Sequence, residues 1–244
     1  MYADDLIIMS LTVAGLQQML DCCQRSSEQL LLEFNCKKSN CMVIGPASKY
    51  KIREMSLGNE YIYWSESFKY LGVNFNSGLK LSVDICSIKR KFYVSCNCIL
   101  GNTHSLDDMI KLNLMESYCL SILTYATVAM KLSNAQVNEL NACWNSVYRR
   151  IFDFNKWESV RSFINGLGRL DFYHIRLFMC LKFYSCSLAS NNETYKFISK
   201  LCYLSEHFMT ICFNAGLTMS NYRSFNSISI NKMKAVVCST FALS

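Results

Sequence analysis

Residues that interrupt regular structure are scarce in this chain. Its 244 residues include one proline, Pro46, and nine glycines. Because proline and glycine are the strongest local breakers of helices and strands, their scarcity favours long helices with short connections over an all-β sandwich. Hydrophobic residues make up 51% of the chain, which is enough for a core in one large domain or two small ones.

Signatures of zinc sites and of secretion are missing, although cysteine is abundant. The chain has 14 cysteines and three histidines, but no Cys-x-x-Cys pair and no histidine at zinc-finger spacing. We find no signal peptide, so we expect a cytoplasmic or nuclear protein that is not secreted, with most cysteines acting as small buried hydrophobic residues. No uncharged apolar run reaches about 18 residues, so no membrane span is expected.

Charge is only weakly basic. There are 25 Lys and Arg residues against 18 Asp and Glu residues, a net charge of +7. This balance is compatible with a nucleic-acid partner but does not require one.

The first third of the chain mixes strand and helix patterns. Apolar runs at 6–9 and 41–45 are typical of buried strands, and 12–34 carries apolar residues at helical spacing after the capping residue Thr12. Two strand candidates within 53–64 flank a Gly-Asn turn signal, and 67–75 reads as one further strand. Gly72 inside that run suggests a bulge or a close backbone approach.

After Gly78 the pattern is mainly helical. Polar residues that suit a helix start are Ser82, Ser105 followed by Asp107 and Asp108, and Ser133 with Gln136, which form a capping box. Gly166 and Gly168 mark a break before helical stretches at 171–189 and 193–213. We expect the aromatic residues Trp144, Tyr148 and Trp157 in the helical core.

Two adjacent aspartates, Asp4 and Asp5, precede the first apolar run. Carboxylates at the tip of a strand hairpin suit Mg²⁺, which prefers oxygen ligands, and two such ions about 4 Å apart promote phosphoryl transfer. That chemistry also needs a carboxylate from a different strand. An Asp-Asp pair is also ordinary turn chemistry, so the pair alone does not establish a catalytic site.

Several segments resemble, in the family's order, motifs of the reverse transcriptases of non-LTR (LINE-type) retrotransposons. "YADDLIIMSLTVAGLQQMLD" resembles the catalytic hairpin and the palm helix after it, "LLEFNCKKSNCMVIG" the next motif, and "FKYLGVNF" the strand that supports the primer terminus. "LNLMESYCLSILTYATVAM", "ELNACWNSVYRRIF" and "WESVRSFINGLGRLDFYHIR" resemble the helical region after the polymerase core. The match runs from Tyr2 to about Leu188.

The resemblance implies a fold and a division of the chain. The fold class would be α+β: a partial polymerase palm of short antiparallel strands and one packing helix, followed by an all-helical thumb and post-thumb region. The palm would occupy 1–78, the helical region 79–214, and a loosely structured tail 215–244.

The resemblance also implies catalytic and nucleotide-binding roles near the start. Asp4 would be a catalytic metal-binding carboxylate, and Asp5 beside it would have a supporting metal role. Tyr2 and Ala3 would lie near the incoming nucleotide. Lys38 would be the general acid that protonates pyrophosphate, and Lys37 is a close second because the register does not separate the two. A solvated lysine pair at a helix end is the alternative.

Two further sets of residues would contact the primer and its template. Phe68, Tyr70, Leu71 and Gly72 would form the primer grip, although Tyr70 and Leu71 also fit a plain core. Lys89, Arg90 and Lys91 would lie on the first thumb helix and meet the backbone of the template–primer duplex. A solvated helix face is the alternative for these three.

The match begins within the catalytic motif, so the fingers and the strand bearing the other metal-binding aspartate have no counterpart in it. We therefore expect a truncated RNA-directed DNA polymerase that is inactive alone. The parent enzyme would use Mg²⁺ or Mn²⁺, an RNA template, an RNA–DNA duplex and deoxynucleotides, but this fragment would not organise the metal. The alternatives are a non-catalytic nucleic-acid-binding remnant that uses the basic thumb helix, and a decayed reading frame without a stable fold.

Overall fold

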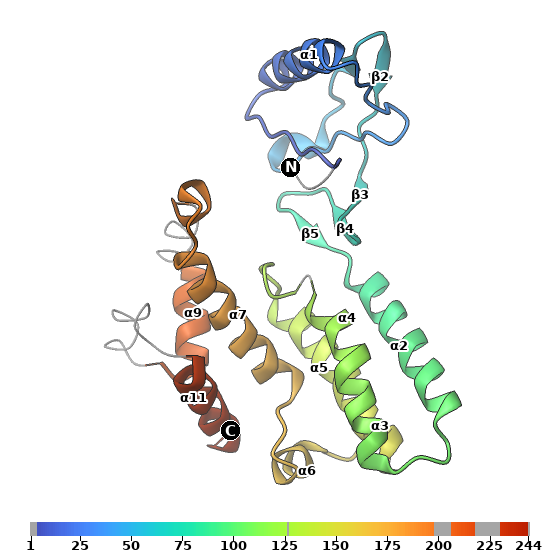
Figure 1. The fold of residues 1–244 in the computed structure, drawn as a ribbon, viewed down its shortest axis with the longest axis vertical. Helices are drawn as coiled ribbons and strands as arrows, with labels where there is room; N and C mark the ends of the chain where they lie inside the picture. The colour runs from blue at the N-terminus through green and yellow to red at the C-terminus, as the bar shows by residue number, and fades with distance from the viewer. Residues whose placement is uncertain (1–3, 126, 198–205, 218–229, 244) are drawn as a thin grey trace. The chain divides into compact units, whose positions relative to one another are not determined.

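The computed structural model describes residues 4–125, 127–197, 206–217 and 230–243. It is a mixed α+β protein with two small antiparallel sheets, which confirms the predicted class at that level. The chain divides into two compact units, Met1–Asp84 and Ile85–Ser244. Both sheets belong to the first unit, and the described elements of the second are helices (Figure 1). The expected boundary was residue 78; the division falls after Asp84 because 82–83 pair with the second sheet.

The first helix, α1 (Val13–Gln29), is capped as expected and is shorter than expected. Thr12 is the N-cap, and its side chain accepts a hydrogen bond from the Gly15 N–H. The helix ends at Gln29 rather than Phe34 because Leu31 takes a left-handed conformation with φ of 54°. The Leu32 N–H then donates back to the Ser27 carbonyl at 2.9 Å, which closes the helix end.

The first sheet is the hairpin of β1 (Met55–Leu57) and β2 (Glu60–Ile62), turned at Gly58 as the sequence predicted. The inward side chains of the hairpin, Met55, Leu57 and Ile62, form a small core with Leu20 of α1 and with Cys41. Because strand residues alternate between faces, Tyr61 points away from this core and is exposed. A short 3₁₀ turn, η1 (Pro46–Lys49), precedes the hairpin in the chain.

The second sheet has three strands in the order β3 (Ser67–Tyr70), β4 (Val73–Asn76), β5 (Ser82–Val83). The prediction of one strand over 67–75 was wrong, because Leu71 and Gly72 make a two-residue turn with φ of 45° and 81°. Gly72 supplies that turn conformation and not a close approach, since no atom lies within 4 Å of where its Cβ would be. The prediction that a helix starts at Ser82 was also wrong.

Two other predicted strands do not form. Residues 6–9 have no strand structure, and 41–45 contribute only isolated bridges, Cys41 to Trp64 and Ile44 to Gly78. A strand is stabilised by a continuous ladder to a neighbour. Neither apolar run has such a neighbour among the described residues, so both predictions were wrong.

The second unit contains, in chain order, α2 (Ile85–Asn102), α3 (Asp108–Leu114), the π-helical turn η2 (Met115–Cys119), α4 (Leu120–Thr124), α5 (Asn134–Ile151), α6 (Arg161–Gly166), α7 (Phe172–Leu188), α9 (Glu206–Asn214) and α11 (Ile230–Leu243), and residues 193–197 are helical as well. The helix that starts at Asp107 and Asp108 and the helix that follows Ser133 were both predicted. Ser133 and Gln136 form the capping box in both directions. None of the helices in the described part of the chain is long and apolar enough to span a membrane.

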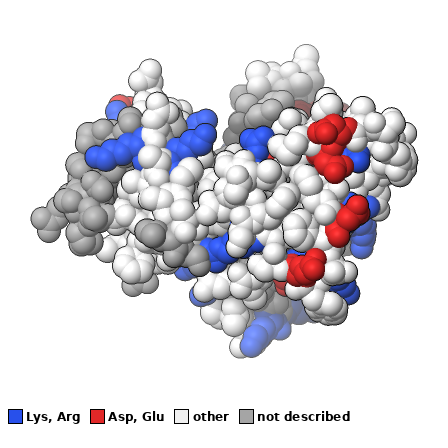
Figure 2. Space-filling model, turned by 90° about the horizontal axis from the view of Figure 1, so that it is seen from below, with Lys and Arg blue, Asp and Glu red and all other residues white. Residues whose placement is uncertain are grey.

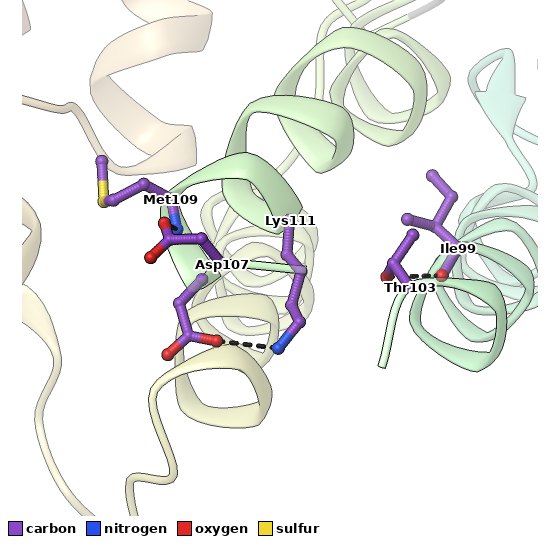
Figure 3. A network of polar contacts seen from close by, with 6 residues as sticks. Ile99, Thr103, Asp107, Met109 and Lys111 are labelled. Carbon is purple, nitrogen blue, oxygen red and sulfur yellow. Dashed lines mark hydrogen bonds and ion pairs between the residues drawn. The ribbon is translucent and has the colours of Figure 1, made fainter. Parts of the chain in front are cut away.

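The corner between α2 and α3 shows how local polar contacts set the helix ends (Figure 3). The Thr103 hydroxyl donates to a carbonyl of the last turn of α2 at 2.8 Å. Asp107 caps α3 by accepting from the Met109 N–H at 2.8 Å, and Lys111 pairs with Asp108 at 2.8 Å. The acidic residues that marked a helix start in the sequence therefore act at that start.

An aromatic ladder and an apolar cluster form the core of the helical unit. Trp144 and Tyr148 are fully buried on α5, as predicted, and Trp144 lies 6.4 Å from Phe92 of α2, ring centre to ring centre. Trp157 is 88% exposed, so its predicted core position was wrong. The second cluster joins α7, α9 and α11, and its α11 members are Met233 and Val237. The described tail after residue 230 is thus a packed helix and not the loose segment expected.

Candidate functional site

The predicted metal-binding residues lie at the start of the described chain. Asp4 and Asp5 are both exposed, while Tyr2 and Ala3 lie outside the described residues. A two-metal centre needs further oxygen ligands from neighbouring elements. No group of three or more His, Cys, Asp or Glu side chains that could hold a metal occurs in 4–125, 127–197, 206–217 or 230–243. In the described part of the chain, no third ligand therefore joins Asp4 and Asp5 to complete a Mg²⁺ or Mn²⁺ pair.

The candidate general acids lie in the loop after α1. Both Lys37 and Lys38 are exposed. Asn35 shapes the loop, because its carbonyl and its Oδ1 each accept from the Lys38 N–H at 3.1 Å. Lys37 lines an open recess of about 480 Å³, whose other lining residues are Cys36, Ser39, Asn40, Glu60, Tyr61 and Tyr63.

Charge and burial within this recess act on Cys36. Burial raises the pKa of the Cys36 thiol, and the nearby Glu60 carboxylate raises it further. The thiol also points toward the Leu57 carbonyl, at 3.8 Å. Both effects disfavour the thiolate, which is the nucleophilic form of cysteine.

The predicted primer-grip residues form one structural feature, the β3–β4 hairpin. Phe68 pairs with Phe75 across the ladder, and their rings stack at 5.6 Å between centres. Tyr70 pairs with Val73, and Leu71 with Gly72 makes the turn. The structure thus brings these candidates together on one hairpin. The backbone groups of its turn and one face of its strand ladder lie next to each other.

The predicted duplex-binding residues lie on α2 but do not share one role. Lys89 Nζ forms an ion pair with Glu139 Oε2 of α5 at 2.7 Å, so its charge is already partnered within the helical unit. This hydrogen bond raises the pKa of the Lys89 amine. Arg90 and Lys91 are exposed. Of the three candidates, these two are exposed and Lys89 is half-buried.

Basic charge is concentrated in the helical unit. Residues 1–84 carry eight Lys or Arg against nine Asp or Glu, a net charge of −1, whereas 85–244 carry 17 against nine, a net charge of +8. On the face that Figure 2 shows, basic side chains form several separate groups, and acidic side chains form groups on the right-hand side of the same face. The net positive charge is thus spread over the helical unit and is not confined to α2.

Sequence reasoning missed a buried polar group at the start of α7. Asp171 caps this helix by accepting from the His174 N–H at 3.0 Å, and its Oδ1 also lies 2.6 Å from His174 Nδ1. Arg176, one turn further, is buried and donates to the carbonyls of Thr127 and Met130, each at 3.0 Å. These contacts fix the chain after α4 against α7. An aspartate three residues before a histidine was the only local signal, and it fits any capped helix.

A second missed group surrounds the π-helical turn. Glu116 on η2 and Arg169 before α7 approach to 3.4 Å. Burial raises the pKa of the Glu116 carboxyl, and Arg169 partly opposes that shift. The Tyr148 hydroxyl lies buried nearby, and burial with the Glu116 charge raises its pKa well above the usual range. No short-range sequence pattern joins these three positions.

Comparison with known proteins adds no assignment. No protein-family model matches the sequence, no curated protein matches it, and no solved structure matches it.

Proposed function

We propose that this chain is a relative of the reverse transcriptases of non-LTR retrotransposons whose helical unit binds nucleic acid and which has no polymerase activity alone. Two observations support the proposal. The segments that resemble that family follow its order from Tyr2 to about Leu188. The net charge of +8 lies in the helical unit, which is the part that would correspond to the thumb. The concentration of positive charge in the helical unit is the observation that supports nucleic-acid binding, because the neutralisation of phosphates dominates nucleic-acid affinity.

The proposal assigns the phosphate contact on α2 to Arg90 and Lys91. Both residues are exposed, whereas Lys89 is half-buried and forms an ion pair with Glu139 at 2.7 Å. Breaking an ion pair to contact a phosphate would cost part of what the new contact gains. The proposed phosphate contact on α2 therefore uses two residues of the three-residue basic run in the sequence.

The lack of polymerase activity follows from the carboxylates. Asp4 and Asp5 are adjacent and exposed, and no third metal-binding side chain joins them in the described residues. Two adjacent carboxylates alone supply too few oxygen ligands to hold two divalent cations about 4 Å apart against the repulsion between those cations. Most of the electrostatic stabilisation of phosphoryl transfer would then be lost.

The binding function is tested by a salt titration with an RNA–DNA duplex. The double variant Arg90→Glu/Lys91→Glu should weaken binding and reduce the slope of log affinity against log salt by roughly 0.9 for each lost phosphate contact. The matched control is Lys49→Glu/Lys51→Glu, which makes the same charge change at exposed lysines of the first unit. Equal slopes for the two double variants would refute α2 as the contact, and no duplex binding by the wild type would refute the function.

Primer extension tests the catalytic part of the proposal. The wild-type chain, given a primed RNA template, deoxynucleotides and Mg²⁺ or Mn²⁺, should incorporate nothing above background. The matched variant is Asp4→Ala. Incorporation by the wild type that disappears in Asp4→Ala would overturn the proposal of an inactive chain.

A further inference from the structure

The loop between α5 and α6 presents an exposed tryptophan. Trp157 is 88% exposed, and Lys156 Nζ lies 5.0 Å from the centre of its ring. The other two tryptophans, Trp64 and Trp144, are half-buried and buried respectively. An indole left in water forgoes a large gain from burial, so its position calls for an explanation in the surrounding structure.

The turn that carries Trp157 is closed on both sides. The Glu158 N–H donates to the Asn155 carbonyl at 3.1 Å, which makes Lys156 and Trp157 the two central residues of a β-turn. The Glu158 carboxylate also accepts from the Asn155 backbone N–H at 2.7 Å and from its side-chain amide at 3.0 Å. The lysine and the indole are thus presented together by a turn with little freedom.

The base of the loop is fixed to the end of α5. Arg149 Nε donates to the Glu158 carbonyl at 2.9 Å, and the Phe154 N–H donates to the Arg149 carbonyl at 3.0 Å. The Phe154 ring packs on Phe163 of α6 at 5.0 Å between centres. None of these contacts uses the indole, so the loop keeps its structure without help from Trp157.

The surroundings of the indole are polar and mostly basic. The exposed neighbours of Trp157 in the turn are Asn155, Lys156, Glu158 and Ser159. Over 149–161 there are four basic residues, Arg149, Arg150, Lys156 and Arg161, against the two acids Asp153 and Glu158. The Asn155 hydrogen bonds hold the Glu158 carboxylate in place but leave it charged, so the net positive charge of this segment comes from its four basic residues outnumbering its two acids.

We infer that Trp157 and Lys156 form a stacking site for one unpaired nucleobase, with the lysine contacting an adjacent phosphate. The inference deepens the proposed nucleic-acid-binding function and rests on it. Base–aromatic stacking tolerates any sequence because every base has a π-face, and a rigid aromatic residue next to a cation is the usual platform for it. In a duplex both faces of each base are already covered, so the site selects single strands.

The same observations disfavour a protein partner. A tryptophan that anchors a protein–protein interface is normally surrounded by further side chains that exclude water around it. Here the indole is exposed at the tip of a polar turn, and the amine that lies 5.0 Å from its ring centre can contact a phosphate. A protein partner is therefore the outcome to be excluded by experiment.

The test compares a short unstructured single-stranded RNA with an RNA–DNA duplex of the same length, using the full chain and fluorescence anisotropy. Trp157→Ala should weaken single-strand binding by about tenfold or more, while Trp157→Phe should retain most of the affinity. The salt slope should be unchanged in Trp157→Ala but about 0.7 smaller in Lys156→Ala, because only the lysine neutralises a phosphate. Phe213→Ala, which removes an aromatic ring that is 81% exposed on α9, is the matched control.

The outcomes separate the two proposals. Wild-type affinity in Trp157→Ala, or an equal loss on the duplex and on the single strand, would refute the stacking site and leave general binding standing. If the wild type binds neither nucleic acid, the proposed function and the stacking site fall together. A thermal transition that is unchanged in each variant shows that the fold is intact, as expected for side chains outside the core.

Discussion

Gln17 of α1 and Ser56 of β1 are joined by a reciprocal pair of hydrogen bonds. The Gln17 amide Nε2 donates to the Ser56 carbonyl at 2.8 Å, and its Oε1 accepts from the Ser56 N–H at 3.0 Å. One side chain thus satisfies both backbone groups of a strand residue that would otherwise face a helix. The two hydrogen bonds fix the position of α1 along β1. In a larger sheet, the ladder to a neighbouring strand would fix the register of β1 in the same way.

We expect Gln17→Ala to destabilise the first unit by about 1–3 kcal/mol, because two partly buried backbone groups lose their partner. Urea unfolding, followed by far-UV circular dichroism, measures the loss. Gln18→Ala is the matched control, since Gln18 is the exposed neighbour on the same helix and the change in helix propensity is equal. Equal stabilities of the two variants would show that the hydrogen bonds contribute nothing net.

The ion pair between Lys89 and Glu139 should contribute modestly and in a defined pH range. Both side chains are partly exposed, so a double-mutant cycle of Lys89→Met and Glu139→Gln should give a coupling of about 0.2–1 kcal/mol. Because the hydrogen bond raises the pKa of Lys89, the coupling is complete below the ordinary lysine value, about pH 10.4, and is lost as pH rises through the raised value. A coupling that disappears already at pH 8 would contradict this assignment.

Signals that act within one turn of chain could be predicted from the sequence. Thr12 and the Ser133–Gln136 pair cap helices because a cap needs only the next three residues. The Gly58 turn was predictable for the same reason. Long helices after residue 84 followed from helical spacing and from the scarcity of proline and glycine.

Features that depend on distant partners, or on unusual backbone, could not be predicted. The runs at 6–9 and 41–45 have strand composition, but composition does not supply a ladder partner. Leu31 and Leu71 adopt positive φ, which leucine rarely does, so a helix end and a hairpin turn were both missed. In the candidate site, the pairing of Lys89 with Glu139 and the exposure of Trp157 depend on tertiary packing that helical spacing does not encode.

Leu71 lies in a turn position whose backbone conformation is unfavourable for leucine. Two positive φ values, 45° at Leu71 and 81° at Gly72, match a type I′ hairpin turn, which favours Asn-Gly. We expect Leu71→Asn to stabilise the first unit by about 1 kcal/mol, because leucine carries a steric cost in the left-handed region. The midpoint of urea unfolding measures the gain.

Leu79→Asn separates this backbone effect from the removal of an exposed leucine. Leu79 is 62% exposed and is not among the described residues with positive φ. It should therefore show no comparable gain. A gain of the same size in both variants would show that replacing an exposed leucine by a polar residue is the cause, and not the turn conformation.

Cys119 should be slow to react although its thiol is acidified. A hydrogen bond with Cys96 lowers the pKa of Cys119, while burial opposes the shift. The Cys119 side chain is nevertheless fully buried in η2, and a thiolate reacts only when the reagent reaches it. We expect mass-spectrometric mapping of iodoacetamide labelling at pH 8 to show exposed Cys98 and Cys186 modified first, and Cys119 only as fast as the helical unit opens. Labelling of Cys119 should then accelerate with urea in step with unfolding, whereas labelling of Cys98 should not. Rapid modification of Cys119 in the folded chain would show that α2 and η2 separate readily, which their buried contacts argue against.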